Sequence, residues 1–523
     1  MSENFDMSEK KGICYLVGAG PGDPGLITLR GKACIEMADV VVYDNLSNDE
    51  FLSWARPEAE RIFAGKKSKC HALHQSEIND LLVEKSKSGK VVVRLKGGDP
   101  LVFGRGGEEA TALRQAGIDF EFVPGISSAI AAPAYAGIPL THREHCSQLT
   151  IFTGHENPSK PESSMNYAQI AKAPGTKVML MGVARLGIIM QSIIDEGGDP
   201  TTPVALVRMA TTGQQKTVTG TLATIDDVVK AADFKAPAVC VIGTVVNCRE
   251  GLNWFEDKPL SGKRVVVTRT LKQAGKLSSG LRELGADVIE MPTIKVSRCE
   301  GDDARRFAHC VAEVHTYDWL IFTSPNAVEY FFEAFDLIRE DARAIGGARI
   351  AAVGPGTSAK LKEYRMATDL MPKDNLAEGL IEAFREEAGS IENTTMLWVR
   401  AKETRDVLSE ALDEAGVILD EAIAYQTVPE TEDPTGAVKR FREEGADIIT
   451  FTSSSTVEGF LDMGLDIPDE VSIASIGPVT SKTLSESNYE PDAEAKSHDI
   501  PGLIAAVVQL ANEAAFDGDD FEA

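Results

Sequence analysis

Short apolar runs alternate with longer amphipathic stretches along almost the whole chain. The runs are typical of buried strands, and residues 108–115 and 356–362 have the spacing of helices. This regular alternation is characteristic of parallel sheets covered by helices, so it predicts an α/β fold throughout. The predicted strands are 13–17, 40–43, 91–95, 149–153, 178–181, 265–268, 319–323, 350–353, 396–399, 448–452 and 471–476.

The clearest break in the pattern is the segment 254–262. Pro259 and Gly262 interrupt it, and a new strand with a basic lead-in follows at once. A chain of 523 residues is too long for one ordinary hydrophobic core. We therefore predict about three or four domains, with the main boundary near residue 258.

Two motifs of the second half occur twice and in the same order. Phe322–Val328 (FTSPNAV) is echoed by Phe451–Val457 (FTSSSTV), and Ala352–Thr357 (AVGPGT) is echoed by Ser475–Thr480 (SIGPVT). Two copies are too few for a solenoid, which needs at least about three repeats for stability. The echo predicts two similar α/β domains that face each other.

The net charge of −27 lies mainly in the second half. Residues 1–257 carry 26 Lys and Arg against 31 Asp and Glu, whereas residues 258–523 carry 27 against 49. A field of this sign disfavours nucleic acid and anionic membranes as partners. An anionic substrate would need positive charge confined to a cleft. No apolar run has the length of a membrane span, and the polar N-terminus lacks the apolar segment of a signal peptide.

The eight cysteines are scattered and form no CxxC pair. This spacing disfavours a metal site or a disulfide framework and is typical of a reducing compartment. We therefore predict a cytoplasmic protein that holds no metal. Residues 1–11 and 513–523 are predicted to be disordered tails, the second ending in the acidic stretch Asp517–Glu522.

A glycine-rich loop, Val17–Gly25 (VGAGPGDPG), follows the first predicted strand, and Asp44 follows the second. One interpretation is a dinucleotide fingerprint, in which glycines form a tight turn and an acid binds a ribose hydroxyl. Pro21 and Pro24 disfavour it, because they remove N–H donors where the turn has to enter a helix. A purely structural turn is the other alternative, and the loop alone does not decide.

Three further motifs are predicted at strand ends or strand-to-helix junctions: Val93–Glu108 (VRLKGGDPLVFGRGGE), Val123–Ser128 (VPGISS) and Ala136–Arg143 (AGIPLTHR). Backbone so dense in glycine permits close approach by a ligand. In this order, the motifs closely resemble the uroporphyrinogen-III C-methyltransferases of the tetrapyrrole methylase family, over residues 12 to about 256. The resemblance implies a two-lobed fold for 12–257, with lobes of about 12–120 and 121–257, and a homodimer formed through this half.

The same resemblance implies S-adenosylmethionine as the cofactor, bound in the cleft between the lobes. Asp44 matches the family's proposed proton acceptor and Lys66 its proposed proton donor. Ala210 stands where the family commonly has glycine. The residues that match the cofactor site are Pro21, Gly97, Gly98, Asp99, Val102, Ser127, Ser128, Met181 and Ala210.

The chemistry of the reaction agrees with these assignments. Methyl transfer from a sulfonium is an in-line displacement, which depends on alignment of the reactants. The nucleophile is a carbon of an electron-rich pyrrole-derived ring, and a carboxylate such as Asp44 can remove its proton within hydrogen-bond reach. A solvated acid at a strand end is the alternative for Asp44. The substrate is rich in carboxylates, and the candidates to bind them are Lys66, Lys67, Lys96, Arg105 and Arg143.

Four short hydroxyl-rich loops follow strands in the second half, at 323–326, 354–357, 452–454 and 477–480. Loops at the carboxyl edge of a parallel sheet bind ligands, and their N–H groups and hydroxyls suit carboxylates. Helix N-caps alone would give the same pattern. With Thr268–Arg269, Ala424–Thr427 and His498–Leu503, the loops resemble uroporphyrinogen-III synthase over residues 262–512.

This second resemblance implies two Rossmann- or flavodoxin-like α/β domains joined by a two-stranded hinge. Domain one would comprise 262–295 plus 428–512, and domain two 296–427. The implied reaction is cyclisation of hydroxymethylbilane with inversion of ring D, in which Tyr425 assists departure of the hydroxyl. A core or hinge role is the alternative for Tyr425. The side chains expected to hold substrate carboxylates are Ser324, Thr357, Ser453, Ser454 and Thr480.

The sequence therefore predicts a bifunctional enzyme that closes hydroxymethylbilane to uroporphyrinogen III and methylates it at C2 and C7 to precorrin-2. Three alternatives stay open. The second half could bind tetrapyrroles without catalysis, or the first half could methylate later corrin intermediates. An NAD-dependent oxidoreductase would rest on Gly18, Gly20 and Asp44.

Overall fold

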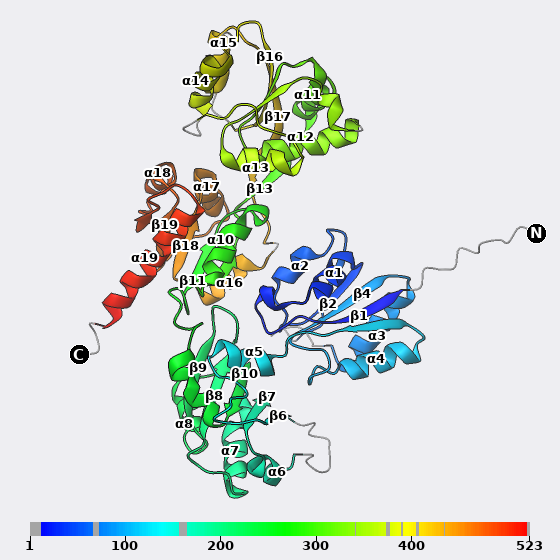
Figure 1. Cartoon of the computed structure of the whole chain (residues 1–523), viewed down its shortest axis with the longest axis vertical. Coiled ribbons are helices and arrows are strands. Elements are labelled where there is room, and N and C mark those ends of the chain that lie inside the picture. Colours follow the sequence, from blue (N-terminus) through cyan, green and yellow to red (C-terminus); the bar gives the residue numbers. More distant parts are fainter. Residues whose placement is uncertain are drawn as a thin grey trace, which may run out of the picture.

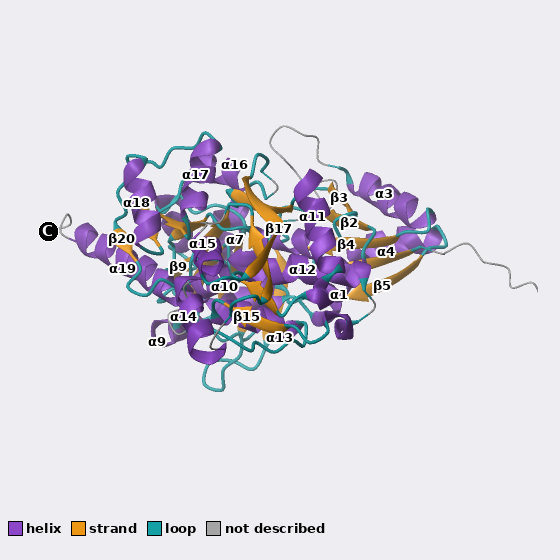
Figure 2. Ribbon diagram, turned by 90° about the horizontal axis from the view of Figure 1, so that it is seen from above, coloured by secondary structure: helices purple, strands orange, loops and turns teal. Residues whose placement is uncertain are grey.

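The computed structural model describes residues 12–65, 73–155, 165–339, 341–372, 377–388, 391–403, 407–433 and 435–519. These residues form four five-stranded sheets, each with helices packed against it (Figure 1 and Figure 2). The α/β fold predicted from the alternating pattern is confirmed: two sheets build a two-lobed first half, and two flavodoxin-like sheets build the second.

The first lobe contains one sheet and the helices that cover it: β1 (Ile13–Gly18), α1 (Leu29–Met37), β2 (Val40–Tyr43), α2 (Glu50–Trp54), β3 (Glu60–Phe63), α3 (Gln75–Lys87), β4 (Val91–Lys96), α4 (Gly106–Gln115) and β5 (Asp119–Val123). All its strands are parallel, in the order β3-β2-β4-β1-β5. Because side chains alternate along a strand, Cys14 and Leu16 pack against α3 and α4, whereas Tyr15 and Val17 pack against α1 and α2. The carboxyl ends of these strands therefore meet at one edge.

The second lobe contains α5 (Ser128–Tyr135), β6 (Leu149–Thr153), α6 (Tyr167–Lys172), β7 (Thr176–Leu180), α7 (Leu186–Asp195), β8 (Pro203–Arg208), β9 (Lys216–Thr221), α8 (Ile225–Ala231), β10 (Ala238–Ile242) and α9 (Arg249–Leu252). The strands of its sheet have the order β6-β7-β10-β8-β9, and the one parallel pair in this sheet is β6 with β7. Helix α5 packs on one face, and α6, α7 and α8 pack on the other.

The domain-one sheet is parallel, with the order β12-β11-β18-β19-β20. Numbered along the chain this order is 2-1-3-4-5, which is the flavodoxin-like arrangement. Helices α10 and α19 cover one face, and α16, α17 and α18 cover the other. The elements are β11 (Arg264–Val267), α10 (Leu271–Glu283), β12 (Asp287–Glu290), α16 (Ala437–Glu444), β18 (Ile448–Phe451), α17 (Ser454–Asp462), β19 (Ser472–Ser475), α18 (Pro478–Glu486), β20 (Ala493–Glu494) and α19 (Ile500–Asp519).

The domain-two sheet has the order β13-β17-β16-β14-β15, and only β13 is antiparallel to its neighbour. Its elements are β13 (Ile294–Arg298), α11 (Gly301–Ala312), β14 (Trp319–Phe322), α12 (Pro325–Ile338), β15 (Arg349–Ala352), α13 (Pro355–Glu363), α14 (Ala377–Ala388), β16 (Thr395–Ala401), α15 (Val407–Glu414) and β17 (Ile418–Pro429). Figure 2 shows the long strand β17 in the middle of the molecule, and α11 and α12 pack against it.

Strands β13 and β17 carry the chain between the two sheets of the second half. They pair as antiparallel neighbours from Ile294 opposite Pro429 to Arg298 opposite Tyr425. Figure 1 shows β13 between the two domains, where a two-stranded hinge was predicted. The repeated motifs also occupy equivalent positions in the two sheets. The FTS copies lie at the ends of β14 and β18, and the GP copies follow the strands paired with these, β15 and β19. The numerical domain limits remain a prediction.

The C-terminal helix extends further than expected. A disordered tail was predicted from residue 513, but α19 continues to Asp519. Ala511, Ala514 and Ala515 are strong helix formers and favour this continuation. Residues 1–11 and 520–523 lie outside the described residues. No described helix has both the length and the apolar character that a membrane span requires.

The two halves touch through domain one of the second half. Arg282 on α10 forms an ion pair with Glu50 on α2, with 2.9 Å between Nη1 and Oε2. Gln214, in the loop between β8 and β9, donates from Nε2 to Asp287 Oδ2 at 2.9 Å. Domain one therefore contacts both lobes of the first half. The boundary predicted near residue 258 falls close to a third contact, where Gly262 N donates to Gly213 O.

Candidate active sites

The loops at the carboxyl edge of the first-lobe sheet come together as the motifs predicted. The glycine loop after β1 and the loop after β4 form a short antiparallel bridge, with hydrogen bonds of 2.7 Å and 3.2 Å between Gly20 and Gly98. Asp99 connects a third loop, because its Oδ2 accepts from Gly125 N at 3.1 Å and its Oδ1 from Leu101 N at 2.8 Å. Both oxygens of Asp99 thus hold backbone in place.

Glycine is required where these loops cross. A Cβ added at Gly125 would lie 2.3 Å from Gly98 O and 2.7 Å from Gly18 Cα, which no folded backbone tolerates. Gly98 has a left-handed φ of 70°. A Cβ there would lie 3.7 Å from Ser128 N, in ordinary van der Waals contact with the start of α5, so the left-handed φ and not a lack of space favours glycine at this position. Ser127 caps α5 by accepting from Ala129 N.

The second lobe contributes strand ends with unusual backbone. Met181 after β7 and Thr211 after β8 are non-glycine residues with positive φ of 57° and 69°. Such strained conformations are concentrated at functional sites. Met181 is half exposed, at 52%, whereas Ala210 is 8% exposed. The carbonyl oxygen of Ala210 lies beside Gly22 of the glycine loop, so the loop after β8 reaches the first lobe.

Asp23 is the residue that joins the lobes, and sequence reasoning missed its role. Its backbone N donates to Thr211 Oγ1 at 3.0 Å, and its Oδ2 accepts from Tyr135 OH at 2.7 Å. Both partners belong to the second lobe. Burial and the nearby Asp23 carboxylate raise the pKa of Tyr135, so its hydroxyl remains a donor. No sequence motif links residues so far apart along the chain.

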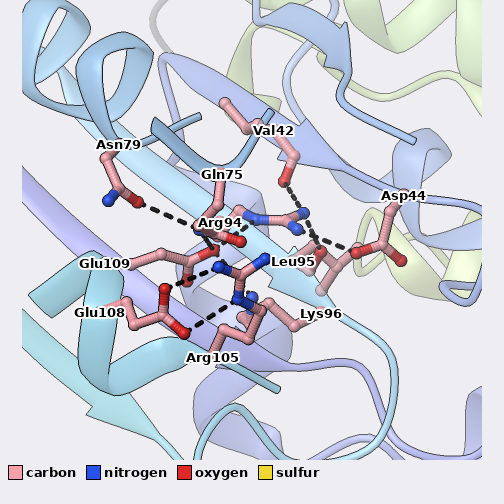
Figure 3. Close-up of polar contacts among 10 residues, drawn as sticks. All are labelled: Val42, Asp44, Gln75, Asn79, Arg94, Leu95, Lys96, Arg105, Glu108 and Glu109. Atoms are coloured by element: carbon pink, nitrogen blue, oxygen red, sulfur yellow. Dashed lines mark hydrogen bonds and ion pairs between the residues drawn. The ribbon is translucent and has the colours of Figure 1, made fainter. Parts of the chain in front are cut away.

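Asp44 lies at the end of β2 and is held by a buried arginine (Figure 3). Arg94 Nη2 donates to Asp44 Oδ2 at 2.9 Å, and Leu46 N donates to Asp44 Oδ1 at 3.1 Å. The Asp44 side chain is 24% exposed and that of Arg94 only 5%. Behind them, Glu109 accepts from Arg94 Nε at 3.3 Å and from Lys96 Nζ at 2.8 Å. Asp44 is therefore a fixed carboxylate that still reaches solvent.

Three of the basic residues proposed to bind substrate differ in their surroundings. Lys96 is 5% exposed and bound to Glu109, which disfavours its assignment to substrate carboxylates. Lys96 follows Arg94 by two residues on β4, so both side chains point to the face of the sheet that α3 and α4 cover. Arg105 and Arg143 are exposed, and Arg105 pairs with Glu108 at 2.7 Å. Lys66 and Lys67 lie outside the described residues.

In the second half, Tyr425 on β17 lies beside the loop that follows β14. Its hydroxyl is 2.8 Å from Ser324 Oγ, and its ring stacks on Tyr330 with centroids 5.6 Å apart. Burial raises the pKa of Tyr425, against opposing hydrogen bonds to Ser324 and Asn326. The side chain is 7% exposed. Tyr425 thus stays protonated at neutral pH and is oriented by a serine at a helix N-terminus.

Two of the four hydroxyl-rich loops supply side-chain N-caps, whereas the N-caps of α13 and α18 are Gly354 and Gly477. Ser324 Oγ accepts from Ala327 N at the start of α12, and Ser453 Oγ accepts from Thr456 N at the start of α17. Ser454 Oγ accepts from Thr483. Thr357 and Thr480 are each 3% exposed, because they lie inside the first turn of α13 and α18. Such burial disfavours direct contact of these two hydroxyls with a substrate in this conformation.

Two family models match the chain: the tetrapyrrole (corrin/porphyrin) methylases over residues 14–226 and uroporphyrinogen-III synthase HemD over residues 275–505. A porphyrin biosynthesis protein HemD from Ruminiclostridium josui is 36% identical over 507 residues, covering 97% of this chain and 99% of that protein. A uroporphyrinogen-III C-methyltransferase from Bacillus subtilis (strain 168) is 41% identical over 366 residues, covering 70% of this chain and 74% of the relative. The crystal structure of uroporphyrin-III C-methyltransferase from Thermus thermophilus is 37% identical, with a TM-score of 0.40, and covers 45% of this chain and 99% of that one.

These matches and the two sheet edges define a two-part α/β enzyme of tetrapyrrole biosynthesis. The chain belongs to the family in which a tetrapyrrole methylase is followed by a uroporphyrinogen-III synthase. It combines a uroporphyrinogen-III C-methyltransferase and a uroporphyrinogen-III synthase in one polypeptide. The dinucleotide interpretation of Val17–Gly25 is therefore wrong, as Pro21 and Pro24 indicated.

Proposed function

We propose that the chain closes hydroxymethylbilane to uroporphyrinogen III with inversion of ring D, and then methylates this product at C2 and C7 to precorrin-2. The observation that carries the proposal is the presence of both families, in this order, along one chain that a single relative matches over 97% of its length. The product of the second half is the substrate of the first. Fusion would keep an easily oxidised intermediate close to the enzyme that consumes it.

Residues of both lobes fit S-adenosylmethionine as the cofactor. In the first lobe, Gly98 has no side chain to keep a ligand away from the main chain. In the second lobe, the thioether chain of Met181 is half exposed and the backbone after β8 has positive φ. When bound there, S-adenosylmethionine supplies a methyl group activated by a sulfonium. The residues assigned to hold it are Pro21, Gly97, Gly98, Asp99, Val102, Ser127, Ser128, Met181 and Ala210.

Asp44 is assigned to accept the proton that the ring carbon releases as it gains the methyl group. Its carboxyl group is partly exposed and fixed by Arg94 and the Leu46 N–H. A fixed base within hydrogen-bond reach contributes to such a step without reorganisation. Lys66 is assigned as proton donor, and it lies outside the described residues. Arg105 and Arg143 are assigned to substrate carboxylates, for which Arg105 would exchange its partner Glu108.

In the second half, loss of hydroxide from a pyrrolic carbinol is chemically easy, so the work of the enzyme is to fold the linear substrate for attack by ring D. Tyr425 is assigned to donate a proton to the departing hydroxyl, since it is neutral and oriented by Ser324. Ser324, Ser453, Ser454, Thr357 and Thr480 are assigned to substrate carboxylates, of which the first three are the less buried.

The assembly and location of the enzyme are part of the same proposal. We assign a homodimer formed through the methyltransferase half, in the cytoplasm, without a metal or a nucleic-acid partner. The scattered cysteines and the net charge of −27 support the reducing compartment and the absence of nucleic acid. Light scattering on the purified full chain measures the oligomeric state directly.

Anaerobic incubation of the purified chain with hydroxymethylbilane and S-adenosylmethionine tests the function. The expected product is precorrin-2 of the type III series. Formation of only type I isomers or their methylated products would remove the synthase assignment. Accumulation of unmethylated uroporphyrinogen III would remove the methyltransferase assignment instead.

A further inference from the structure

A cluster of buried charges lies directly behind Asp44. Glu109 on α4 is fully buried, Arg94 and Lys96 on β4 are 4% and 5% exposed, and Figure 3 shows the side chains converging. The Glu109 Oε1 atom accepts from Arg94, Lys96 and Gln75, at 3.3 Å, 2.8 Å and 3.3 Å. Among the described residues its Oε2 atom has no hydrogen-bond partner. A buried carboxylate that is only half satisfied is costly and calls for a functional reason.

Arg94 is the link between this cluster and the proposed base. Its Nε binds Glu109, its Nη1 donates to Leu95 O at 3.0 Å, and its Nη2 donates to Asp44 Oδ2. A guanidinium is a planar fork, so anchoring Nε and Nη1 also fixes the direction of Nη2. The orientation of Asp44 therefore depends on Glu109, which never touches it.

We propose that Glu109 is a positioning residue for methyl transfer, which holds Arg94 and Lys96 behind Asp44 and so fixes both the orientation and the charge surroundings of that carboxylate. The inference rests on the proposed role of Asp44 as proton acceptor. It adds a buried residue on α4, which need not contact the cofactor or the substrate, to the groups on which the proposed proton acceptor depends.

The formal charges of the four clustered side chains add up to zero. Arg94 and Lys96 supply two positive charges, and Asp44 and Glu109 supply two negative charges. Three further titratable groups lie near the cluster among the described residues. Glu108 is close to Lys96 and Arg105 is close to Glu109, and these two pair with each other. Cys14 on β1 is the third, and burial raises the pKa of its thiol to about 12, so it stays neutral. Without Glu109 the cluster keeps one uncompensated positive charge next to Asp44, and a nearby positive charge makes a carboxylate a weaker base.

Lys96 determines how that excess charge depends on pH. Burial and the neighbouring Arg94 lower the pKa of Lys96, whereas Glu109 raises it. Once Glu109 is neutralised, Lys96 loses its main stabilising partner and releases its proton at a lower pH than before. The excess charge is then present at low pH and disappears as the pH rises.

The test uses Glu109→Gln, the double variant Lys96→Met/Glu109→Gln, and Asp44→Ala in the full chain, assayed anaerobically with uroporphyrinogen III and S-adenosylmethionine. Glu109→Gln is expected to lower kcat by about 10- to 100-fold, with cofactor affinity within about twofold of the parent. The loss is expected to be largest at low pH and to shrink as the pH rises. Lys96→Met/Glu109→Gln removes the excess charge with a side chain of similar shape, so it is expected to recover most of the turnover and to lack the added pH dependence.

Glu121→Gln is the matched control, because Glu121 also binds an arginine through two contacts, with Arg30, but on the exposed surface of the same lobe. It is expected to behave as the parent. A pH-independent loss in Glu109→Gln that the double variant does not rescue would assign Glu109 a structural role only and overturn the inference. Parent-like turnover in Glu109→Gln would overturn it as well. Full turnover in Asp44→Ala would instead remove the proposed base, and the inference with it.

Discussion

The two catalytic halves arrange polar groups at their sheet edges in different ways. At the first-lobe edge, Asp44 is backed by a network of buried ions that continues through Arg94 to Glu109. At the edges of the second half, the predicted positions carry hydroxyls that cap helices, such as Ser324 and Ser453, and a neutral tyrosine. One half therefore has a preorganised charge, and the other has adjustable neutral donors.

The difference follows from what each reaction requires. Removal of a proton from carbon needs a carboxylate whose orientation and ionisation are fixed before the substrate arrives. Cyclisation of a linear tetrapyrrole needs a flexible, polyanionic chain to be wrapped, and hydroxyls and N–H groups can bind carboxylates in many positions. Domain one and domain two are also joined by the strands β13 and β17, whereas two hydrogen bonds of Asp23 link the two lobes of the first half.

The largest effect is expected from Asp44→Ala. Removal of the base is expected to lower methyl transfer by about 100- to 10,000-fold, with cofactor affinity and cyclisation of hydroxymethylbilane unchanged. Product analysis and calorimetry measure the two quantities separately. Asp119→Ala, an exposed acid at the amino end of β5, is the control. Unchanged methylation in Asp44→Ala would show that the first half does not use this carboxylate, and the functional difference between the charged edge of the first half and the neutral edges of the second would no longer hold.

Gly125→Ala tests whether the first edge is as rigid as its loop crossing indicates. The added Cβ would overlap Gly98 O and Gly18 Cα, so overpacking is expected to cost about 1–3 kcal/mol of stability and to weaken cofactor binding. Thermal unfolding and calorimetry provide the measurements. Gly107→Ala is the control, because a Cβ there meets nothing within 4 Å. Equal stability and equal cofactor affinity in the two variants would show that the loops crossing at Gly18, Gly98 and Gly125 can move apart without cost.

Tyr425→Phe tests the role of the neutral Tyr425 hydroxyl at the sheet edge of domain two. Loss of the hydroxyl is expected to lower cyclisation about tenfold and to raise the share of type I isomer, while methylation of added uroporphyrinogen III continues. Because burial raises the pKa of Tyr425, the parent rate is expected to be independent of this group through neutral pH and to fall only in alkali. Tyr330→Phe keeps the stacked ring and serves as the control. A parent-like isomer ratio would assign Tyr425 to the core.

The smallest effect is expected from Arg282→Ala at the contact between the halves. Arg282 and Glu50 are 31% and 25% exposed, and pairs of this kind contribute about 0.2–1 kcal/mol. The expected result is a slight fall in the unfolding temperature with both activities retained. Gln214→Ala, which removes the hydrogen bond to Asp287 between the halves, is the companion variant. A large change in either activity would show that the halves depend on each other.

Local patterns of the sequence predicted the strands and the site loops well. The predicted strands 40–43 and 149–153 match β2 and β6, and the helix predicted at 356–362 matches α13 within a residue at each end. The loops after β1, β2 and β4 directly follow predicted strands, so much of the edge of the first sheet could be predicted from hydrophobic runs and glycines alone, whereas β5 and β8 were not among the predicted strands.

What could not be predicted depends on distant contacts and on helix phase. Glu108 and Glu109 are adjacent in sequence, yet only the rotation of α4 against the sheet makes one exposed and the other buried. The orientation of β4 likewise buries Lys96, a candidate for substrate binding whose burial could not be predicted from the sequence. Asp23 meets Thr211 and Tyr135 across 188 and 112 positions, a separation that no local motif records.

The hinge strands have a consequence for synthesis on the ribosome. Domain two is inserted between β12 and β18, so β11 and β12 emerge long before the three strands that complete their sheet. The methyltransferase lobes are contiguous and are expected to fold first, as N-terminal domains do. Domain one can close only after α19 has been translated. A nascent chain stalled after residue 429 is therefore expected to methylate uroporphyrinogen III but to be unable to make it.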